Sequence, residues 1–253
     1  MGQPLSIEYV GHSTVLVEIE TIRLLTDPVL RSRVGPLRRV GGPRVPPVPP
    51  DVDAILISHL HRDHLDIPTL RSIGREHRLL VPRGAATWLR GQGFSDVDEM
   101  SPGETISLGG VQVHAVHARH PGFRPPAGPL AEAIGFLIEG SRSVYFAGDT
   151  ALFGAMSELA GAVDVALLPV GGWGPTLRAR HHLDPPDAAR AAALIRPRIA
   201  VPIHWGTYWP IGLTWLRPAR RYGPPKHFLE AAAELAPDAR IRVTEIGHPV
   251  NLQ

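Results

Sequence analysis

The chain has 253 residues, a formal net charge of +2, 43% hydrophobic residues and a mean hydropathy of −0.01. This length and composition predict a globular protein with a sizeable core, which we expect to form one domain over residues 1–253. The sequence contains no cysteine, so disulfides, thiolate metal ligands and a cysteine nucleophile are excluded. A net charge this close to zero does not indicate nucleic acid as a partner.

The sequence shows neither a secretory signal nor an apolar run that approaches the roughly 18 residues of a membrane-spanning helix. We therefore expect a cytoplasmic protein. Its first part predicts three strands, because apolar and β-branched residues alternate over Leu5–Val10, Thr14–Ile19 and Ile22–Leu25.

The following segment, residues 31–50, is rich in proline and glycine and carries arginines at positions 31, 33, 38, 39 and 44. Proline fixes φ and lacks the N–H that a strand ladder needs, so the composition predicts an extended surface loop without a strand. Two interpretations stay open for this loop. It covers the protein as a strap, or the Arg-rich part over 31–44 forms a cationic lip that contacts the substrate.

Further along the chain, predicted strands alternate with short helices over Pro68–Gly74, Gly84–Gly91, Leu152–Ala160, Pro185–Ile195 and Pro225–Leu235. Two hairpins are expected, one joining Thr105–Leu108 to Val111–Val116 and one joining Ala133–Glu139 to Ser143–Phe146. The pattern by itself supports an α/β or α+β fold class.

The motif Ser58–His64, with the sequence SHLHRDH, directly follows the apolar segment Ala54–Ile57. A helix would scatter its potential ligands around the surface, whereas a tight loop at the end of a buried strand can turn them inward. Imidazole and carboxylate groups together suit zinc and similar divalent ions. The motif therefore predicts metal binding by four residues: His59, His61, Asp63 and His64.

Three isolated residues follow later predicted strands, where a loop can carry chemistry on a rigid scaffold: His120, Asp149 and His204. The whole set resembles the metallo-β-lactamase superfamily in the order of its residues. That resemblance implies a four-layer αββα metallo-β-lactamase sandwich of class α/β (α+β). It also implies two divalent ions per chain, one bound by His59, His61 and His120, the other by Asp63, His64 and His204, with Asp149 bridging them.

Additional motifs are similar to those of one branch of the superfamily, which contains N-acyl-phosphatidylethanolamine-hydrolysing phospholipase D and borders the ascorbate-6-phosphate lactonases. They include Gly11–Glu18, Leu25–Pro28, Leu168–Gly171, His182–Pro185 and Ile203–Thr207.

On this resemblance His182 contacts the substrate, while His12 and Asp27 orient ligands or loops, or are simply satisfied in turns. Arg124 matches an arginine of the branch with a structural or ligand-orienting role. Asp184 is also a plausible N-cap, followed by Pro185 at the first helical position.

The chain departs from the branch at Pro121, where tryptophan usually follows the third histidine, and in the proline-rich continuation over 124–129. The segment from Trp205 through Trp215 to Leu216 is aromatic and apolar. It belongs either to the core or a C-terminal flap, or to an apolar wall for an acyl or aryl group of the substrate, with Trp205 as the candidate contact.

The resemblance implies a hydrolase in which two metal ions activate a hydroxide. Asp63 and His182 are the expected catalytic residues, and the serines, Ser58 included, are interpreted as structural. Zinc suits the ligands, with manganese or iron as alternatives. We expect a phospholipase D-like phosphodiesterase acting on a small-molecule or lipid-like ester. A lactonase or other carboxylic-ester hydrolase is the main alternative. A non-catalytic metal-binding protein fits less well, because all seven ligand positions are filled.

Overall fold

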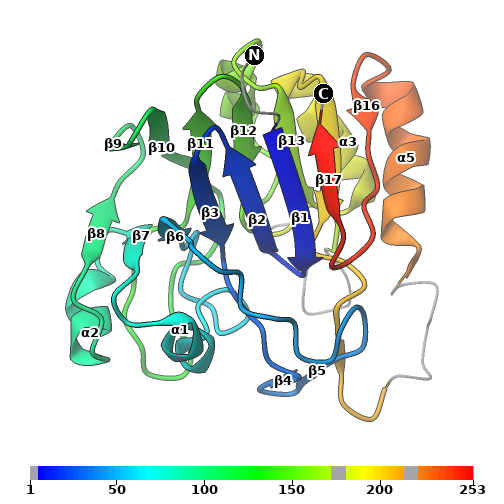
Figure 1. The fold of residues 1–253 in the computed structure, drawn as a ribbon. Coiled ribbons are helices and arrows are strands. Elements are labelled where there is room, and N and C mark those ends of the chain that lie inside the picture. Colours follow the sequence, from blue (N-terminus) through cyan, green and yellow to red (C-terminus); the bar gives the residue numbers. More distant parts are fainter. Residues whose placement is uncertain (1–4, 172–180, 214–221, 253) are drawn as a thin grey trace.

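The protein is described by a computed structural model that covers residues 5–171, 181–213 and 222–252 (Figure 1). Two seven-stranded sheets face each other. The first has the strand order β17 (Pro249–Leu252), β1 (Leu5–Gly11), β2 (Thr14–Ile19), β3 (Ile22–Thr26), β6 (Ala54–Leu56), β7 (Arg78–Pro82) and β8 (Val97–Met100). The second has the order β16 (Arg240–Ile241), β14 (Ile199–Ile203), β13 (Val165–Pro169), β12 (Ser143–Phe146), β11 (Ile134–Glu139), β10 (Val111–His117) and β9 (Thr105–Leu108).

The space between the sheets is filled by every second residue of their strands, because side chains alternate between the two faces of a strand. The inward residues are apolar and fully or almost fully buried, for example Leu5, Ile7 and Tyr9 of β1 and Ile134, Phe136 and Ile138 of β11. Strand β13 is buried on both faces, since Val165 and Leu167 contact this core while Ala166 and Leu168 contact the helices outside it. This explains why β13 has no polar residue.

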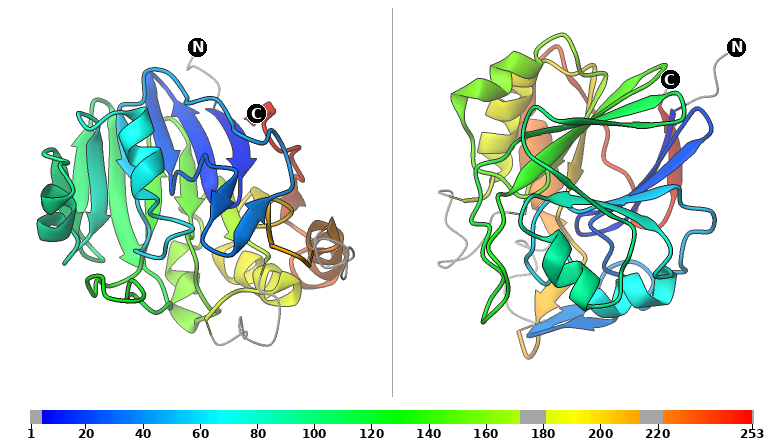
Figure 2. Two further views of the ribbon diagram at one scale, coloured as in Figure 1. Left: turned by 90° about the horizontal axis from the view of Figure 1, so that it is seen from below. Right: turned by 90° about the vertical axis from the view of Figure 1, so that its left-hand side faces the viewer.

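Helices cover the outer face of each sheet (Figure 2). On the first sheet, α1 (Ile67–Ile73) and α2 (Ala86–Gly91) contribute to one buried apolar cluster. On the second, α3 (Pro185–Ile195), α5 (Pro224–Leu235) and the 3₁₀ helix η1 (Gly154–Leu159) contribute to another. The expected four-layer αββα sandwich is therefore confirmed.

Local sequence signals account for the helix starts. The Asp66 side chain accepts a hydrogen bond from Thr69 N at the start of α1, and Asp184 accepts one from Asp187 N at the start of α3. Each aspartate thus caps one of the backbone N–H groups that a helix leaves without a partner. The two predicted hairpins form as β9–β10 and β11–β12, and the predicted helix over Leu152–Ala160 is the shorter 3₁₀ helix η1.

The prediction of an extended loop without strands over residues 31–50 was wrong. Residues Arg33–Val34 form β4 and Leu37–Arg39 form β5, and β5 pairs with the distant β15 (Tyr208–Pro210) in a small third sheet. This sheet lies at the lower end of the molecule in Figure 1, near α1.

Arg39 holds the small sheet to the rest of the protein, although only 5% of this residue is exposed. Its guanidinium donates to three carbonyl oxygens, those of Val10, of Pro43 at 2.8 Å and of Val29 at 3.4 Å. A buried charge of this kind is tolerated because hydrogen bonds replace its hydration. Among the described residues, no helix is both long and apolar enough to cross a membrane.

Replacing Arg39 with methionine should lower the free energy of unfolding by roughly 2–4 kcal/mol, because three carbonyl oxygens would lose a charged donor. Urea unfolding of the metal-free protein measures this effect. Arg38→Met is the matched control, since Arg38 lies beside it on β5 and is exposed, and it should stay within about 0.5 kcal/mol of the unmodified protein. Equal effects of the two substitutions would contradict the role given to Arg39.

Candidate metal centre

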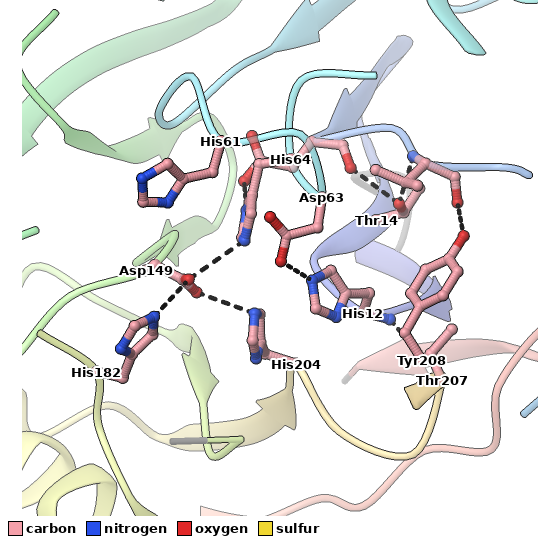
Figure 3. Close-up of polar contacts among 12 residues, drawn as sticks. His12, Thr14, His61, Asp63, His64, Asp149, His182, His204, Thr207 and Tyr208 are labelled. Atoms are coloured by element: carbon pink, nitrogen blue, oxygen red, sulfur yellow. Dashed lines mark hydrogen bonds and ion pairs between the residues drawn. The ribbon is translucent and has the colours of Figure 1, made fainter. Parts of the chain in front are cut away.

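Loops that follow strands of both sheets bring predicted ligands together, among them Asp63, His64, Asp149 and His204 (Figure 3). His59, His61, Asp63 and His64 lie between β6 and α1, whereas the remaining predicted ligands follow β10, β12 and β14 of the second sheet. Ligand atoms within 4.8 Å of one another form four overlapping groups: His59, His61 and His120; His12, Asp63, His64 and His204; Asp27, His59 and His64; His120, Asp149 and His182. All seven side chains predicted as ligands are therefore brought together.

In the first group three ring nitrogens point at a common position. Nε2 of His59 and Nε2 of His120 each lie 3.1 Å from Nδ1 of His61. Burial lowers the pKa of all three rings, that of His120 to about 4, so they are neutral and offer lone pairs. The other nitrogen of His120, Nδ1, lies 2.7 Å from the carbonyl oxygen of His181 and donates to it in this tautomer. Neutral imidazoles fixed in this way are the form that binds divalent metals.

Asp149 lies at the centre of the other ligands. One carboxylate oxygen, Oδ2, is 3.3 Å from Nε2 of both His64 and His182, and Oδ1 is 3.3 Å from Nε2 of His204. Yet Oδ1 of Asp149 and the Nε2 atoms of His64 and His204 are buried without a hydrogen-bond partner in the described parts of the chain. Such orphaned donors and acceptors are costly unless a ligand satisfies them, so these atoms fit a divalent cation.

The charges of the site agree with that fit. Burial would raise the pKa of Asp149, but the nearby His204 and His64 hold it well below its usual value, so the carboxylate is charged. Burial would lower the pKa of His64, but Asp149 and Asp27 raise it well above 6.5. With a raised pKa, His64 holds a proton on the nitrogen that faces Asp149. A cation bound between the two residues would replace this proton, because a metal ion binds the deprotonated form of its ligands.

Asp27 fixes ligands of both groups. Its fully buried carboxylate accepts hydrogen bonds from Ser58 N at 2.7 Å and Ser58 Oγ at 2.6 Å, and it lies 2.7 Å from Nδ1 of His64. Ser58 Oγ is also 3.0 Å from Nδ1 of His59. Ser58 was predicted to be structural only, and its contact with His59 was not foreseen from the sequence. Its position between a buried strand and His59 was the available signal.

His12 has a comparable position on the other side of the centre. Its Nε2 lies 3.1 Å from Oδ2 of Asp63, and its carbonyl oxygen accepts a 2.7 Å hydrogen bond from His204 N. The backbone of His12 is left-handed, with φ of 59°, and its N–H donates to Thr207 Oγ1. Residues hold this conformation only where their surroundings enforce it. His12 therefore couples Asp63 to the loop that carries His204.

Two further predicted residues have identifiable contacts. Arg124 Nη1 donates to the carbonyl oxygens of Leu60 at 2.6 Å and Leu65 at 3.0 Å. Leu60 lies within the predicted metal-binding loop, residues 58–64, and Leu65 directly follows it. His182, whose side chain is 12% exposed, lies with Nε2 towards Asp149. Arg124 thus fixes the backbone of the loop that carries the predicted ligands, and His182 lies beside the candidate metal centre. The functional roles of these residues stay predictions.

The aromatic segment after His204 favours the core interpretation. Trp205 donates through Nε1 to the carbonyl oxygen of Pro202, and it packs against the ring of Tyr9. It also contacts both the core between the sheets and the apolar cluster beneath α3 and α5. Tyr208 and Trp209 are buried in the small sheet. Trp205 is only partly buried, and its contact with a substrate stays a prediction, while Trp173 and Trp215 lie outside the described residues.

An open pocket of about 770 Å³ borders the centre on the side of His120. Its apolar lining comes from Pro121, Ala151 and Leu152, and its polar lining from Arg119, His120, His181 and Asp187. A pocket of this size holds a substrate much larger than the hydrolysed bond itself.

Comparison with known proteins identifies the family. A family model described as a beta-lactamase superfamily domain matches residues 22–205. The chain belongs to the metallo-β-lactamase superfamily. The predicted branch is also supported, because N-acyl-phosphatidylethanolamine-hydrolyzing phospholipase D 1 of Caenorhabditis elegans is 31% identical over 231 residues, which cover 81% of this chain and 65% of that protein. The chain thus spans just under two thirds of the length of this relative.

A second curated relative matches over almost its whole length, and a solved structure shares the fold. A UPF0173 metal-dependent hydrolase of Methanopyrus kandleri is 32% identical over 251 residues, covering 95% of this chain and 97% of that protein. The solved structure of Igni18, a metallo hydrolase from Ignicoccus hospitalis, superposes with a TM-score of 0.74 at 23% identity and covers 99% of both chains. This superfamily member is accordingly a metal-dependent hydrolase, with a histidine and aspartate cluster able to bind metal.

Asp27→Asn should lower metal affinity by about 10- to 100-fold, because an amide cannot accept from His64, Ser58 N and Ser58 Oγ as a carboxylate does. Competition with a chromogenic chelator measures the affinity. Asp164→Asn is the matched control: Asp164 also accepts from the N–H and hydroxyl of a serine, Ser143, but lies outside the ligand groups. An unchanged affinity in Asp27→Asn would contradict the proposed orientation of His59 and His64.

Proposed function

We propose that this hydrolase binds two divalent ions and cleaves a phosphodiester that carries a lipid-like arm. The observation that supports two ions is the position of Asp149. Its carboxylate oxygens lie 3.3 Å from Nε2 of His64 and of His204, which are predicted to bind one metal ion. Asp149 also shares a group of nearby ligand atoms with His120, which is predicted to bind the other ion. A carboxylate between two such sets can bridge two metals. The abundance of imidazole favours zinc, and the carboxylates also suit manganese or iron.

Bound ions would supply an acidified water as nucleophile and positive charge at the attacked centre. Asp63 is suited to hold the attacking water by accepting its hydrogen bond. Burial would raise the pKa of Asp63, but His12 and His64 hold it well below its usual value, so the carboxylate is an acceptor. Its bond to Nε2 of His12 fixes the orientation of the carboxylate.

His182 is proposed to contact the substrate. Its Nε2 lies 3.3 Å from Oδ2 of Asp149, and its ring centroid lies 4.8 Å from that of His120 and 6.4 Å from that of His204. Nδ1 of His182 is buried without a hydrogen-bond partner among the described residues, so a substrate oxygen that reached it would satisfy it. A nitrogen in this position can hydrogen-bond to a phosphoryl or leaving-group oxygen.

Two features support the phosphodiester. A phosphoryl centre gains negative charge during attack, and two cations are suited to stabilise that charge. The relative from Caenorhabditis elegans is named for hydrolysis of a phospholipid, and the apolar wall of the pocket, formed by Pro121, Ala151 and Leu152, would accommodate a lipid-like arm.

A lactonase or other carboxylic-ester hydrolase is the second candidate, because two of the five arginines of the predicted cationic lip are engaged elsewhere. Arg31 makes two hydrogen bonds, of 2.8 and 2.7 Å, to the carboxylate of Asp66, and Arg39 is bound to carbonyl oxygens. Neither guanidinium is therefore free to clamp a phosphate. A neutral ester would need no such clamp.

Metal analysis of the loaded protein should give two ions per chain. His204→Ala removes a proposed ligand and should lower the content towards one ion. His182→Ala should keep both ions while turnover falls by roughly 10²-fold, as expected for loss of a group that assists proton transfer or charge stabilisation. Loss of metal in His182→Ala would make this residue a ligand, and a limit of one ion in the unmodified protein would contradict the bridging role of Asp149.

The reaction is tested by the ratio of kcat/KM for an aryl phosphodiester to kcat/KM for a simple lactone, measured at the same metal loading. We expect the phosphodiester to be preferred. A tenfold preference for the lactone, which corresponds to about 1.4 kcal/mol in activation free energy, would overturn the phosphodiesterase assignment and favour the second candidate. An aryl phosphomonoester serves as the control, because it shares the leaving group but lacks the second arm.

A further inference from the structure

Arg119 is an exposed cation in the pocket beside the metal centre. It precedes His120 directly and lines the pocket together with His181, Pro121 and Leu152. Within residues 5–171, 181–213 and 222–252, its guanidinium has no ion pair and no hydrogen bond. Its positive charge is therefore available to a molecule that enters the pocket.

The backbone of Arg119 is held on both sides. Its N–H donates to Thr150 Oγ1 at 2.9 Å, and its carbonyl oxygen accepts from Ala151 N at 3.0 Å. Thr150 is fully buried and directly follows Asp149. The starting point of the Arg119 side chain is thus fixed relative to His120 and Asp149, and a fixed binding group loses less entropy when a ligand binds.

Two other charged side chains of this region are already paired within the part of the chain that the structure describes. Asp187, the carboxylate that lines the same pocket, forms a 2.7 Å ion pair with Arg190. Arg124, the buried arginine of the neighbouring loop, is bound to the carbonyl oxygens of Leu60 and Leu65. Arg119 therefore gives this wall of the pocket a positive charge that the described residues do not neutralise.

We propose that Arg119 is a specificity-determining residue that binds a second anionic group, such as a carboxylate, on the arm of the substrate. The apolar part of that arm would lie against Pro121, Ala151 and Leu152, and the guanidinium would bind the anion through paired N–H donors. The hydrolysed bond would lie at the metal centre. The inference rests on the proposed phosphodiester function and names the substrate class further, as an amphipathic diester with an acidic arm.

The test uses two non-hydrolysable phosphonates that differ in one group, a carboxylate or a carboxamide at the end of an apolar arm. Calorimetry measures their Kd values with the metal-loaded protein. The unmodified protein should bind the carboxylate about tenfold more tightly, which corresponds to about 1.4 kcal/mol. Arg119→Gln should remove the preference, and Arg119→Lys should retain part of it, because lysine keeps the charge but not the planar donor pair.

Arg62→Gln is the matched control. Arg62 is also exposed and lies in the metal-binding loop, but it does not line the pocket. If the preference arises from direct contact with Arg119, Arg62→Gln keeps it. The same loss in both variants would instead assign it to the general electrostatic field and overturn the proposal. Metal content is measured in every variant, since Arg119 adjoins His120.

The outcomes separate this inference from the proposed function. If both phosphonates bind equally to the unmodified protein, the role of Arg119 is overturned and the phosphodiester assignment stands. If neither binds, the phosphodiester assignment fails. A matched pair of carboxylic esters with the same two arms, compared by kcat/KM, then tests Arg119 independently: a carboxylate preference lost in Arg119→Gln supports its role, and no preference overturns it.

Discussion

The metal centre depends on one buried carboxylate, that of Asp27. A charged group without solvent contact is tolerated only when hydrogen bonds replace its hydration, and here Ser58 and His64 supply them. Asp27 orients His64 directly and His59 through the hydroxyl of Ser58. Asp27 shares one ligand group with these two histidines, while His59 also belongs to the group of His61 and His120 and His64 to that of Asp63 and His204. A single anchor therefore sets the relative position of both. The anchor itself is held by the parallel pairing of β3 with β6, because Asp27 N donates to Leu56 O at 2.9 Å.

The centre also requires that the two sheets stay in a fixed relation. The first sheet supplies the metal-binding loop after β6, and the second supplies His120, Asp149 and His204. The hydrogen bond from His204 N to the carbonyl oxygen of His12 joins a strand end of the second sheet to the β1–β2 turn of the first. Close packing at the entrance to the centre extends to Gly148, where a Cβ atom would lie 2.5 Å from Cβ of Ser58 and where φ is 58°. Glycine before Asp149 is thus required by both space and backbone conformation.

The sequence predicted the features that depend on local pattern. Period-two alternation identified the strands that face the common core, and a run of closely spaced ligands after an apolar strand identified the metal-binding loop. The small sheet was missed because its stability comes from pairing Leu37–Arg39 with Tyr208–Pro210, a contact between distant segments that proline content cannot reveal. Arg39 was expected on the surface because the sequence does not reveal this pairing between distant segments. Its burial depends on three carbonyl oxygens that only the folded chain brings together.

The parts of the site that determine the reaction and those that determine the substrate have different structural origins. The ligands sit at the ends of strands whose positions the two sheets fix, which is why membership of the superfamily predicts metal-dependent hydrolysis. The pocket is lined instead by loop residues such as Pro121, Leu152 and His181, and loops vary more readily than the scaffold that carries them. Pro121, the predicted departure from the branch, is one of these lining residues. A smaller, rigid ring than the tryptophan implied by the resemblance would change the proposed substrate wall while leaving His120 in place. The departure from the branch therefore bears on substrate shape more than on the chemistry of the metal centre.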